Sequence, residues 1–446
     1  MKNARYTVLT ILNSLSKKRI TLDASIEKYL REDGNLSKID KSFVTAIVFG
    51  VLRWQRRLDW IISHFSNIKL KKIDPNVLNI LRIGLFQIIY LDKVPVSAAV
   101  NTSVDLCKSP VWISKYINAV LRKASENYQD TPFPPKDKDY VLYLAVQKSF
   151  PEWLIKRWLE KFGFDEINLI CDALNNIPPI SIRANSLKIS RDALFLSLKN
   201  KTKDIFLTEY APYGISFFSP NQPIFELDEY KNGFFQVQDE ASQIVTMVLD
   251  PKPYETVLDT CAGLGGKTGH IAQLMENKGR ILAIDNDKRK LDELEFQMKR
   301  LGINIVETRV HDMMKPLNPD FFQKFDKVLV DAPCSASGVL RRNPDIKWSL
   351  SEIDLCRSRD IQNIVIKNAS KTVKNTGKLV YSVCSTEVEE NEEVITYFLD
   401  NNKNFKIDVP FNVSHKIDTL INEKGFIKTF PHKNNMDGFY IVRLEN

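Results

Sequence analysis

Residues 325–338 place an apolar strand directly before an aspartate, a proline and a cysteine, which constrains the fold more than any other stretch. A short β-branched run bounded by polar residues is typical of a buried strand, and proline cannot continue it. Residues 377–386 show the same pattern, an apolar run that is followed by a cysteine. Cys334 and Cys384 are 50 residues apart, which leaves room for one helix between two strands. In a doubly wound α/β sheet, both thiols would open onto one crevice.

Residues 256–272 form a pattern of strand, glycine-rich turn and helix, which several nucleotide-binding folds share. A Walker A loop would need glycine where Cys261 stands, and a dinucleotide fingerprint would need glycine where Thr268 stands. The turn alone is therefore a weak signal. Its glycines, which let the backbone approach a ligand closely, are Gly263, Gly265 and Gly266.

Two further strand patterns, at residues 280–285 and 304–310, lead to the acids Asp285 and Asp312. An acid about 20 residues after such a turn accepts hydrogen bonds from ribose hydroxyls, and one at a third strand end can receive an adenine amino group. Each acid alone is well explained as a helix cap, but this explanation is poor for all of them together. The set favours an adenosine-bearing ligand without phosphate recognition, and S-adenosylmethionine fits.

Two thiols beside an acid suit methylation of carbon 5 of cytosine, which is a weak nucleophile. A thiolate that adds to carbon 6 makes carbon 5 enamine-like, so that it can take a methyl group from a sulfonium. This route needs a thiolate, a carboxyl group and a base, and Asp331 with the two cysteines supplies such groups. Burial next to a sulfonium and Lys267 would lower a thiol pKa. The remaining cysteines are expected to be inert: Cys107, Cys171, Cys261 and Cys356.

Residues 1–130 hold the basic excess of the chain, with 21 Lys and Arg against 11 Asp and Glu. Such an excess suits a polyanion partner, although ordinary surface charge explains it about equally well. Every periodic pattern in this region is helical. Asp40 is expected to cap one helix, and Asp74, which precedes a proline, is expected to cap another.

An aromatic and basic cluster lies in the same region and comprises Arg53, Trp54, Arg56, Arg57 and Trp60. Its arginines suit phosphate contacts, and its tryptophans suit stacking on a base. For the tryptophans we favour a place in the hydrophobic core. For the arginines we slightly favour contact with RNA over a solvated face.

Residues 94–108 and 118–123 resemble the NusB-type RNA-binding domain, which implies an all-helical RNA-binding fold. Residues 129–138 are proline-rich and polar and are expected to form a linker. The next stretch mixes helix and strand patterns. We therefore predict three domains: a NusB-like helical domain at 1–130, a small α+β bridging domain at 139–232, and an α/β Rossmann-like methyltransferase domain at 233–446.

Residues 325–336 match the signature of the NOL/NOP/Sun family of RNA cytosine-5 methyltransferases at every position. With the NusB-like front, the resemblance implies methylation of 16S ribosomal RNA with S-adenosylmethionine. It implies that Cys384 is the nucleophile and that Cys334 assists product release. Asp331 and Lys267 would contact the target cytosine or the cofactor. Asp285 would hold the ribose and Asp312 the adenine, and the full set of expected cofactor contacts is Cys261, Ala262, Gly263, Gly265, Gly266, Lys267, Asp285, Asp312 and Asp331.

Two positions depart from the family pattern. Gly263 and Leu264 replace the usual Ala-Pro before the paired glycines, so the local turn is expected to differ. Val383 replaces a threonine before Cys384, which removes one hydrogen-bond donor near the expected nucleophile. Residues 342–347 resemble a substrate-facing loop of the family.

The six cysteines are scattered rather than spaced as a disulfide framework, and the histidines form no metal-ligand spacing with them. We therefore expect reduced thiols and no metal. No apolar run approaches the length of a bilayer span, and a signal-peptide core is missing. The expectation is a cytoplasmic protein without a membrane partner, acting as a monomer.

Two other functions stay open. The same chemistry could act on transfer RNA or DNA. Alternatively, the chain could be a non-catalytic RNA-binding assembly or antitermination factor with a degenerate methylase fold. The presence of every expected catalytic residue disfavours this second possibility.

Overall fold

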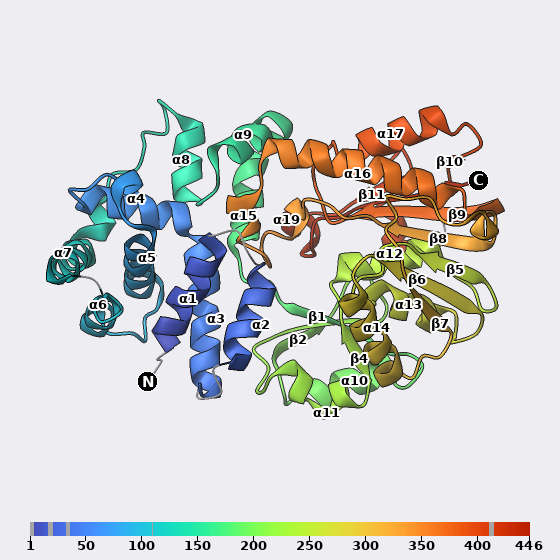
Figure 1. Cartoon of the computed structure of the whole chain (residues 1–446), viewed down its shortest axis with the longest axis horizontal. Coiled ribbons are helices and arrows are strands. Elements are labelled where there is room, and N and C mark those ends of the chain that lie inside the picture. Colours follow the sequence, from blue (N-terminus) through green and yellow to red (C-terminus); the bar gives the residue numbers. More distant parts are fainter. Residues whose placement is uncertain (1–3, 17–20, 33–35, 109, 410–413) are drawn as a thin grey trace. The chain divides into compact units, whose positions relative to one another are not determined.

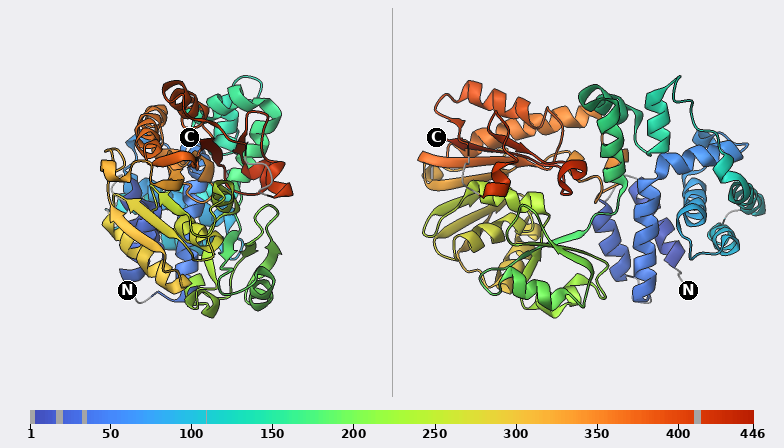
Figure 2. Two further views of the ribbon diagram at one scale, coloured as in Figure 1. Left: turned by 90° about the vertical axis from the view of Figure 1, so that its right-hand side faces the viewer. Right: turned by 180° about the vertical axis from the view of Figure 1, so that it is seen from behind.

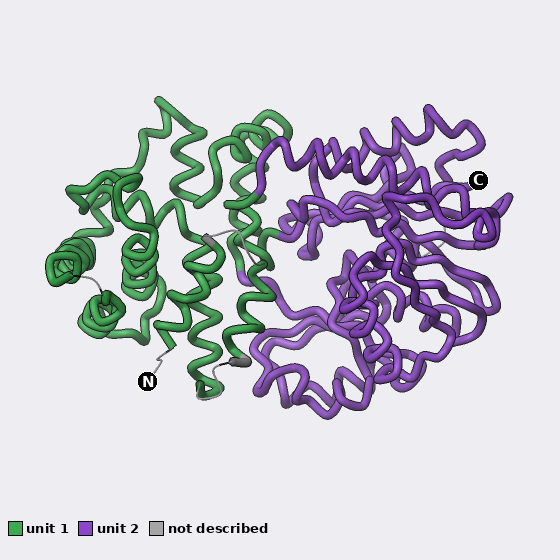
Figure 3. The backbone as a smooth tube through the Cα atoms, viewed as in Figure 1, with its two compact units in different colours: residues 1–176, 340–349 green, residues 177–339, 350–446 purple. Residues whose placement is uncertain are grey.

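The computed structural model describes residues 4–16, 21–32, 36–108, 110–409 and 414–446. The chain divides into two compact units (Figure 3). Unit 1 contains residues 1–176 and 340–349, and unit 2 contains residues 177–339 and 350–446. This division differs from the predicted boundaries, because residues 139–176 and the inserted segment 340–349 belong to the N-terminal unit.

The described residues of unit 1 form helices and connecting loops and contain no strand, as the periodicity predicts (Figure 1). Its helices are α1 (Ala4–Ser16), α2 (Leu22–Glu32), α3 (Lys38–Arg53), α4 (Gln55–Phe65), α5 (Pro75–Tyr90), α6 (Val96–Val104), α7 (Val111–Asn127), α8 (Tyr140–Gln147), α9 (Glu152–Asn175) and α15 (Ile346–Ser349). Asp74 caps α5, and its carboxylate accepts from the backbone N–H groups of Asn76 and Val77. The predicted cap at Asp40 is wrong by three residues: Ser37 is the N-cap of α3, and Asp40 completes its capping box.

The aromatic and basic cluster of unit 1 is mainly structural. Arg53 is only 6% exposed, and its guanidinium donates to the carbonyl of Arg341 at 2.8 Å. Arg56 pairs with Glu152, and the Arg57 guanidinium lies over the Trp54 ring, 5.7 Å from its centroid. The slight preference for RNA contact is therefore wrong for Arg53, because a buried guanidinium cannot reach a phosphate.

The segment 340–349 leaves unit 2 after the Asp-Ala-Pro-Cys stretch and packs within unit 1. Lys347 is fully buried there, and its amine donates to the Asn175 side chain at 2.7 Å and lies over the Phe150 ring. Burial holds the pKa of Lys347 well below its ordinary value. The resemblance of residues 342–347 to a substrate-facing loop is wrong at this lysine, which faces the protein interior.

A small antiparallel sheet begins unit 2, with strand order β2-β3-β1-β4. The strands are β1 (Ile180–Ala184), β2 (Lys203–Leu207), β3 (Gly214–Phe218) and β4 (Phe235–Val237), and the accompanying helices are α10 (Arg191–Leu198) and α11 (Asp228–Lys231). Its core includes the fully buried Ile182, Ile215 and Phe217. The predicted mixture of α and β is confirmed for this region.

A large mixed sheet forms the rest of unit 2, with order β10-β12-β9-β8-β5-β6-β7 and β11 paired to β12. Its strands are β5 (Thr256–Asp259), β6 (Arg280–Asp285), β7 (Val306–Val310), β8 (Phe325–Asp331), β9 (Val373–Val383), β10 (Lys406–Ile407), β11 (Phe426–Lys428) and β12 (Tyr440–Glu445). The five strands β5 to β9 run parallel, and β12 is antiparallel to β9. Figure 2 shows these strands side by side.

Helices cover both faces of the large sheet (Figure 1). One apolar core lies under α12 (Glu240–Leu249), α13 (Gly266–Leu274) and α14 (Lys288–Leu301), and the other lies under α16 (Glu352–Ser370) and α17 (Glu392–Asn401). Successive strand residues alternate between them, so that Val257 joins the first core and Leu258 the second. Two short helices, α18 (His415–Asp418) and α19 (Pro431–Asn434), complete the fold. Within the described ranges, no helix is both long and apolar enough to span a bilayer.

Candidate active site

The ends of two neighbouring parallel strands bring the paired thiols together. Strand β8 ends at Asp331, strand β9 ends at Val383, and Asp331 lies opposite Ser382 in the sheet register. The sulfur atoms of Cys334 and Cys384, just beyond these strand ends, lie 3.2 Å apart. Both thiols are free, and the separation is that of a hydrogen bond rather than of a disulfide. The predicted convergence of the two cysteines is therefore present in the fold.

An ion pair lies beside the strand ends. The Lys267 amine, in the first turn of α13, is 2.6 Å from one carboxylate oxygen of Asp331. The hydroxyl of Ser382 donates to the other oxygen at 2.9 Å. Both carboxylate oxygens are thus held, and the glycine-rich turn that precedes α13 is tied to the end of β8. Burial lowers the pKa of Lys267, but the Asp331 carboxylate, together with the charges of Cys384 and Asp259, raises it by more, so that the pKa is raised overall.

The two thiols differ in their electrostatic surroundings. The pKa of Cys334 lies well above its ordinary value, because of its hydrogen bond to Cys384, its burial and the charges of Cys384 and Glu390. These surroundings disfavour the thiolate form of Cys334. The two sulfurs share a hydrogen bond in which either thiol can be the donor.

The glycine-rich turn is built around positive backbone angles and a strand-end acid. Gly263 and Gly265 have φ values of 54° and 83°, which favour glycine. The Gly263 N–H donates to the Asp285 carboxylate at 3.0 Å, which links the turn to the end of β6. Leu264, one of the two departures from the family, is 57% exposed, so the turn accommodates it without burial. Val383, the other departure, is fully buried in an apolar core, where a hydroxyl would need a partner.

The other expected cofactor residues occupy the same ends of the parallel strands. Ala262 is buried, and its N–H donates to the carbonyl of Ile284 at 2.8 Å. Asp312 follows β7, is half-buried, and accepts from the Met314 N–H at 3.0 Å. Neither contact identifies a ligand, and the assigned roles stay predictions.

The remaining cysteines lie outside the thiol pair. Burial raises the pKa of both Cys171 and Cys261 to about 12, which keeps these thiols protonated. Cys356 is exposed on α16, and Cys107 is half-buried in unit 1. None of the four takes part in a sulfur–sulfur contact like that between Cys334 and Cys384.

Asp259 is a candidate that the sequence argument did not single out. It ends β5, is 1% exposed, and accepts from the Thr268 hydroxyl at 2.8 Å. Its second carboxylate oxygen, Oδ1, has no hydrogen-bond partner among the described residues. Burial raises the pKa of this carboxyl to about 7. The sequence could have indicated Asp259, because it is an acid at the end of the strand that precedes the glycine-rich turn.

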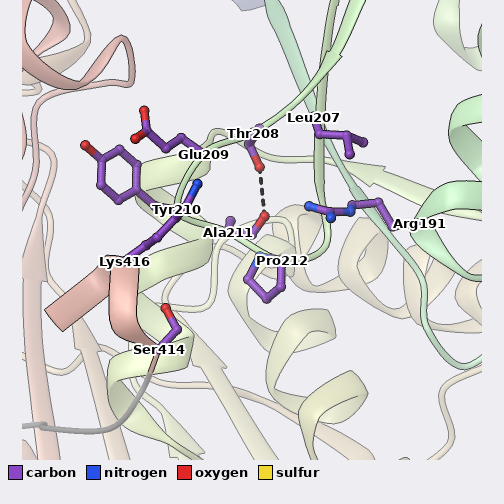
Figure 4. A pocket seen from close by; sticks show the side chains of 9 residues that line it. All are labelled: Arg191, Leu207, Thr208, Glu209, Tyr210, Ala211, Pro212, Ser414 and Lys416. Atoms are coloured by element: carbon purple, nitrogen blue, oxygen red, sulfur yellow. Dashed lines mark hydrogen bonds between the residues drawn. The ribbon is translucent and has the colours of Figure 1, made fainter. Parts of the chain in front are cut away.

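A separate groove of about 590 Å³ lies elsewhere in unit 2 (Figure 4). Its lining residues are Arg191, Leu207, Thr208, Glu209, Tyr210, Ala211, Pro212, Ser414 and Lys416. They include none of the strand-end acids, glycines or paired cysteines. The chemistry-bearing groups therefore define a different site from this groove.

The residues present fit S-adenosylmethionine. A glycine turn allows close approach of an adenosine, strand-end acids can accept from ribose and adenine, and an unpartnered buried carboxylate oxygen suits an ammonium group. A doubly wound sheet with these features and a thiol pair defines the class of S-adenosylmethionine-dependent methyltransferases.

Comparison with known proteins specifies the family. Residues 246–445 match the family described as 16S rRNA methyltransferase RsmB/F, residues 2–126 match the NusB family, and residues 150–222 match the RsmF/B-like ferredoxin-like domain. A relative from Synechocystis, "Probable ribosomal RNA small subunit methyltransferase B", is 33% identical over the whole of both chains. The chain belongs to the RsmB/F family of S-adenosylmethionine-dependent methyltransferases.

Solved structures agree with this membership. The crystal structure of PH0851 has a TM-score of 0.81 and 28% identity, and covers 99% of this chain and 98% of its own. NSun6 from Pyrococcus horikoshii, crystallised with SFG, has a TM-score of 0.60 and 26% identity, and covers 68% of this chain and 99% of its own. The resemblance to the Sun family, the predicted cofactor and the fold class, including the NusB-like, α+β and Rossmann-like parts, are confirmed.

Proposed function

We propose that this chain transfers a methyl group from S-adenosylmethionine to carbon 5 of a cytosine in 16S ribosomal RNA, through a covalent bond between Cys384 and carbon 6. The observation that carries the proposal is the pair of free sulfurs 3.2 Å apart, beside the ion pair of Asp331 and Lys267. The small-subunit names of the relatives support ribosomal RNA as the substrate.

Each side chain has a defined task in this reaction. The Cys384 thiolate adds to carbon 6, and carbon 5 then takes the methyl group. S-adenosylmethionine supplies that group as an electrophilic methyl on a sulfonium. The methyl donor leaves as S-adenosylhomocysteine. A base then takes the carbon 5 proton, the electrons of that bond re-form the double bond between carbons 5 and 6, and Cys384 leaves as a thiolate, so that one proton is released overall. Cys334 assists this last step, and Asp331, held by Lys267, orients the edge of the pyrimidine.

The cofactor would be held at the strand ends of unit 2. Asp285 would accept from the ribose, Asp312 from the adenine, and the glycine turn from Cys261 to Lys267 would lie against the ligand. Asp259, with its unpartnered oxygen, would take the ammonium group. The basic unit 1 would contact RNA, and the chain would act as a cytoplasmic monomer without a metal.

Methylcytosine mapping tests the substrate. Bisulfite sequencing of RNA from a wild-type and a deletion strain should reveal a 16S cytosine that loses its methyl group only in the deletion. Loss confined to transfer RNA would support the transfer RNA alternative. A chain that binds no S-adenosylmethionine in solution would instead be an assembly factor.

Substituting Asp259 with asparagine is expected to change the pH dependence of stability. The folded chain holds a proton on this carboxyl up to about pH 7, whereas the unfolded chain releases it near pH 4. The free energy of unfolding contributed by this group therefore falls as the pH rises from about 4 to about 7. Asp259→Asn removes this fall, and above pH 7 its unliganded melting temperature should exceed that of the unsubstituted chain.

Calorimetry between about pH 5 and 8 measures this effect. Asp287→Asn is the control, because hydrogen bonds from Arg289 hold the pKa of Asp287 at about 2, outside the tested window. Asp259→Asn should also weaken S-adenosylmethionine binding about 10- to 100-fold, the loss expected for a charge-assisted hydrogen bond. Equal pH profiles for the two variants would contradict the assignment.

A further inference from the structure

A buried carboxylate connects the two loops that carry the paired cysteines. Each cysteine is followed by a serine, and both serine hydroxyls donate to the carboxylate of Glu390. The backbone N–H of Ser335 also donates to Glu390, at 2.7 Å. Glu390 is 0% exposed and precedes α17. The loops after β8 and β9 are thus joined at residues adjacent to Cys334 and Cys384.

Neutral donors satisfy this carboxylate. The side-chain amide of Gln362, on α16, donates to Glu390 at 3.1 Å and to the carbonyl of Pro333 at 3.0 Å. The Tyr381 hydroxyl donates to the backbone carbonyl of Glu390 at 2.7 Å. In the described part of the chain, neither lysine nor arginine pairs with Glu390. Burying an acid costs free energy unless hydrogen bonds compensate it, and here the compensating donors come from both cysteine loops and from α16.

The charged and titratable groups around the sulfur pair come from several elements. Lys267 comes from α13, Asp331 from β8, Tyr381 from β9 and Glu390 from the loop before α17. The Lys267 amine interacts electrostatically with Cys384, whereas the Glu390 charge acts on Cys334. The two sulfurs therefore have different charged neighbours.

We propose that Glu390 is a positioning residue that holds the loops of Cys334 and Cys384 in register and so favours attack by one sulfur of the pair over the other. In the proposed function, the favoured sulfur is that of Cys384. The proposal rests on the proposed function, because it explains how one of two adjacent thiols is selected. It goes further, because neither the family signature nor the thiol geometry assigns a role to Glu390 or its serines.

Alkylation by iodoacetamide tests this selection without RNA or cofactor. The full-length chain is treated between about pH 6 and 9, and mass spectrometry measures the initial rates at Cys334 and Cys384. Glu390→Gln keeps the side-chain shape but removes the charge. We expect the ratio of Cys384 to Cys334 rates to fall at least about tenfold, which corresponds to one pKa unit. Glu390→Asp keeps the charge and should retain most of the ratio.

Glu392→Gln is the matched control. Glu392 begins α17, two residues after Glu390, and pairs with Lys428 at 2.5 Å rather than with a serine. Its substitution should leave the alkylation ratio unchanged. A folded Glu390→Gln variant with an unchanged ratio would overturn the proposal, and so would an equal shift in Glu392→Gln. If Glu390→Gln does not fold, Ser335→Ala and Ser385→Ala each remove one donor, and unchanged ratios in both would overturn it.

Methyl transfer supplies a second readout. In Glu390→Gln, kcat should fall about 100-fold, as for a misplaced catalytic group, while the KM for S-adenosylmethionine stays within about threefold. The alkylation assay needs no substrate. Its result can therefore be interpreted even if the RNA substrate is assigned wrongly. A changed alkylation ratio together with absent 16S methylation would retain the positioning role and reject the proposed substrate.

Discussion

Replacing Cys384 with alanine is expected to abolish methyl transfer, with a fall of at least about 10⁴-fold, because no other group can form the bond to carbon 6. The neighbouring Cys334 is not expected to replace it, since burial and the charge of Glu390, which both remain in this variant, still raise the pKa of that thiol. The measurement is incorporation of labelled methyl from S-adenosylmethionine into 16S ribosomal RNA isolated from a deletion strain.

Two controls make this result specific. Cys356→Ala removes an exposed thiol on α16 and should keep full activity. Cofactor binding by Cys384→Ala should stay within about twofold, because the strand-end acids and the glycine turn are untouched. Full activity of Cys384→Ala would show that the roles of the two cysteines are assigned wrongly.

Replacing Cys334 with alanine should not prevent the attack on RNA. Instead, a covalent adduct between protein and RNA should accumulate. Cys384 can still attack carbon 6, but the group that assists release, 3.2 Å away, is missing. We expect most of the protein to carry RNA after one turnover. Denaturing gel electrophoresis detects this as a slower band that ribonuclease removes.

The adduct should require both S-adenosylmethionine and Cys384, so a variant lacking both cysteines should form none. A DNA enzyme would be expected to use the thiol that follows the proline, Cys334, as its nucleophile. A reversed pattern, in which Cys334→Ala is inactive and Cys384→Ala traps RNA, would therefore favour that alternative. Melting temperatures of the variants check that each remains folded, since removing a partly buried sulfur typically costs about 1 kcal/mol.

Local sequence patterns predicted the elements of unit 2 that carry the candidate site. The apolar run before Asp331 and the one before Cys384 became the adjacent strands β8 and β9, because buried parallel strands read as continuous apolar segments. Strand β2 gave no comparable signal, since its residues are largely exposed at the edge of the small sheet. The helix caps were predicted to within three residues, because capping depends on neighbours along the chain.

Residues that act over long sequence separations were not predictable in this way. The Arg53 guanidinium donates to the carbonyl of Arg341, which is 288 residues away in the sequence. The Ser335 N–H donates to Glu390, which is 55 residues away. Arg53 was therefore predicted to contact a phosphate, and Glu390 was not singled out. Burial decides both cases, and burial depends on which distant segments pack together.

The amino-acid sequence by itself determined the strand-end motifs, the pair of cysteines and the class of cofactor, because these depend on residue type and on spacing within one βαβ unit. The tertiary structure alone decided the 3.2 Å separation of the two sulfurs, the carboxylate that joins their loops, and the oxygen of Asp259 that has no hydrogen-bond partner among the described residues. The physical reason is that proton affinity depends on burial and on charges a few ångströms away, and only the packed chain brings those charges together.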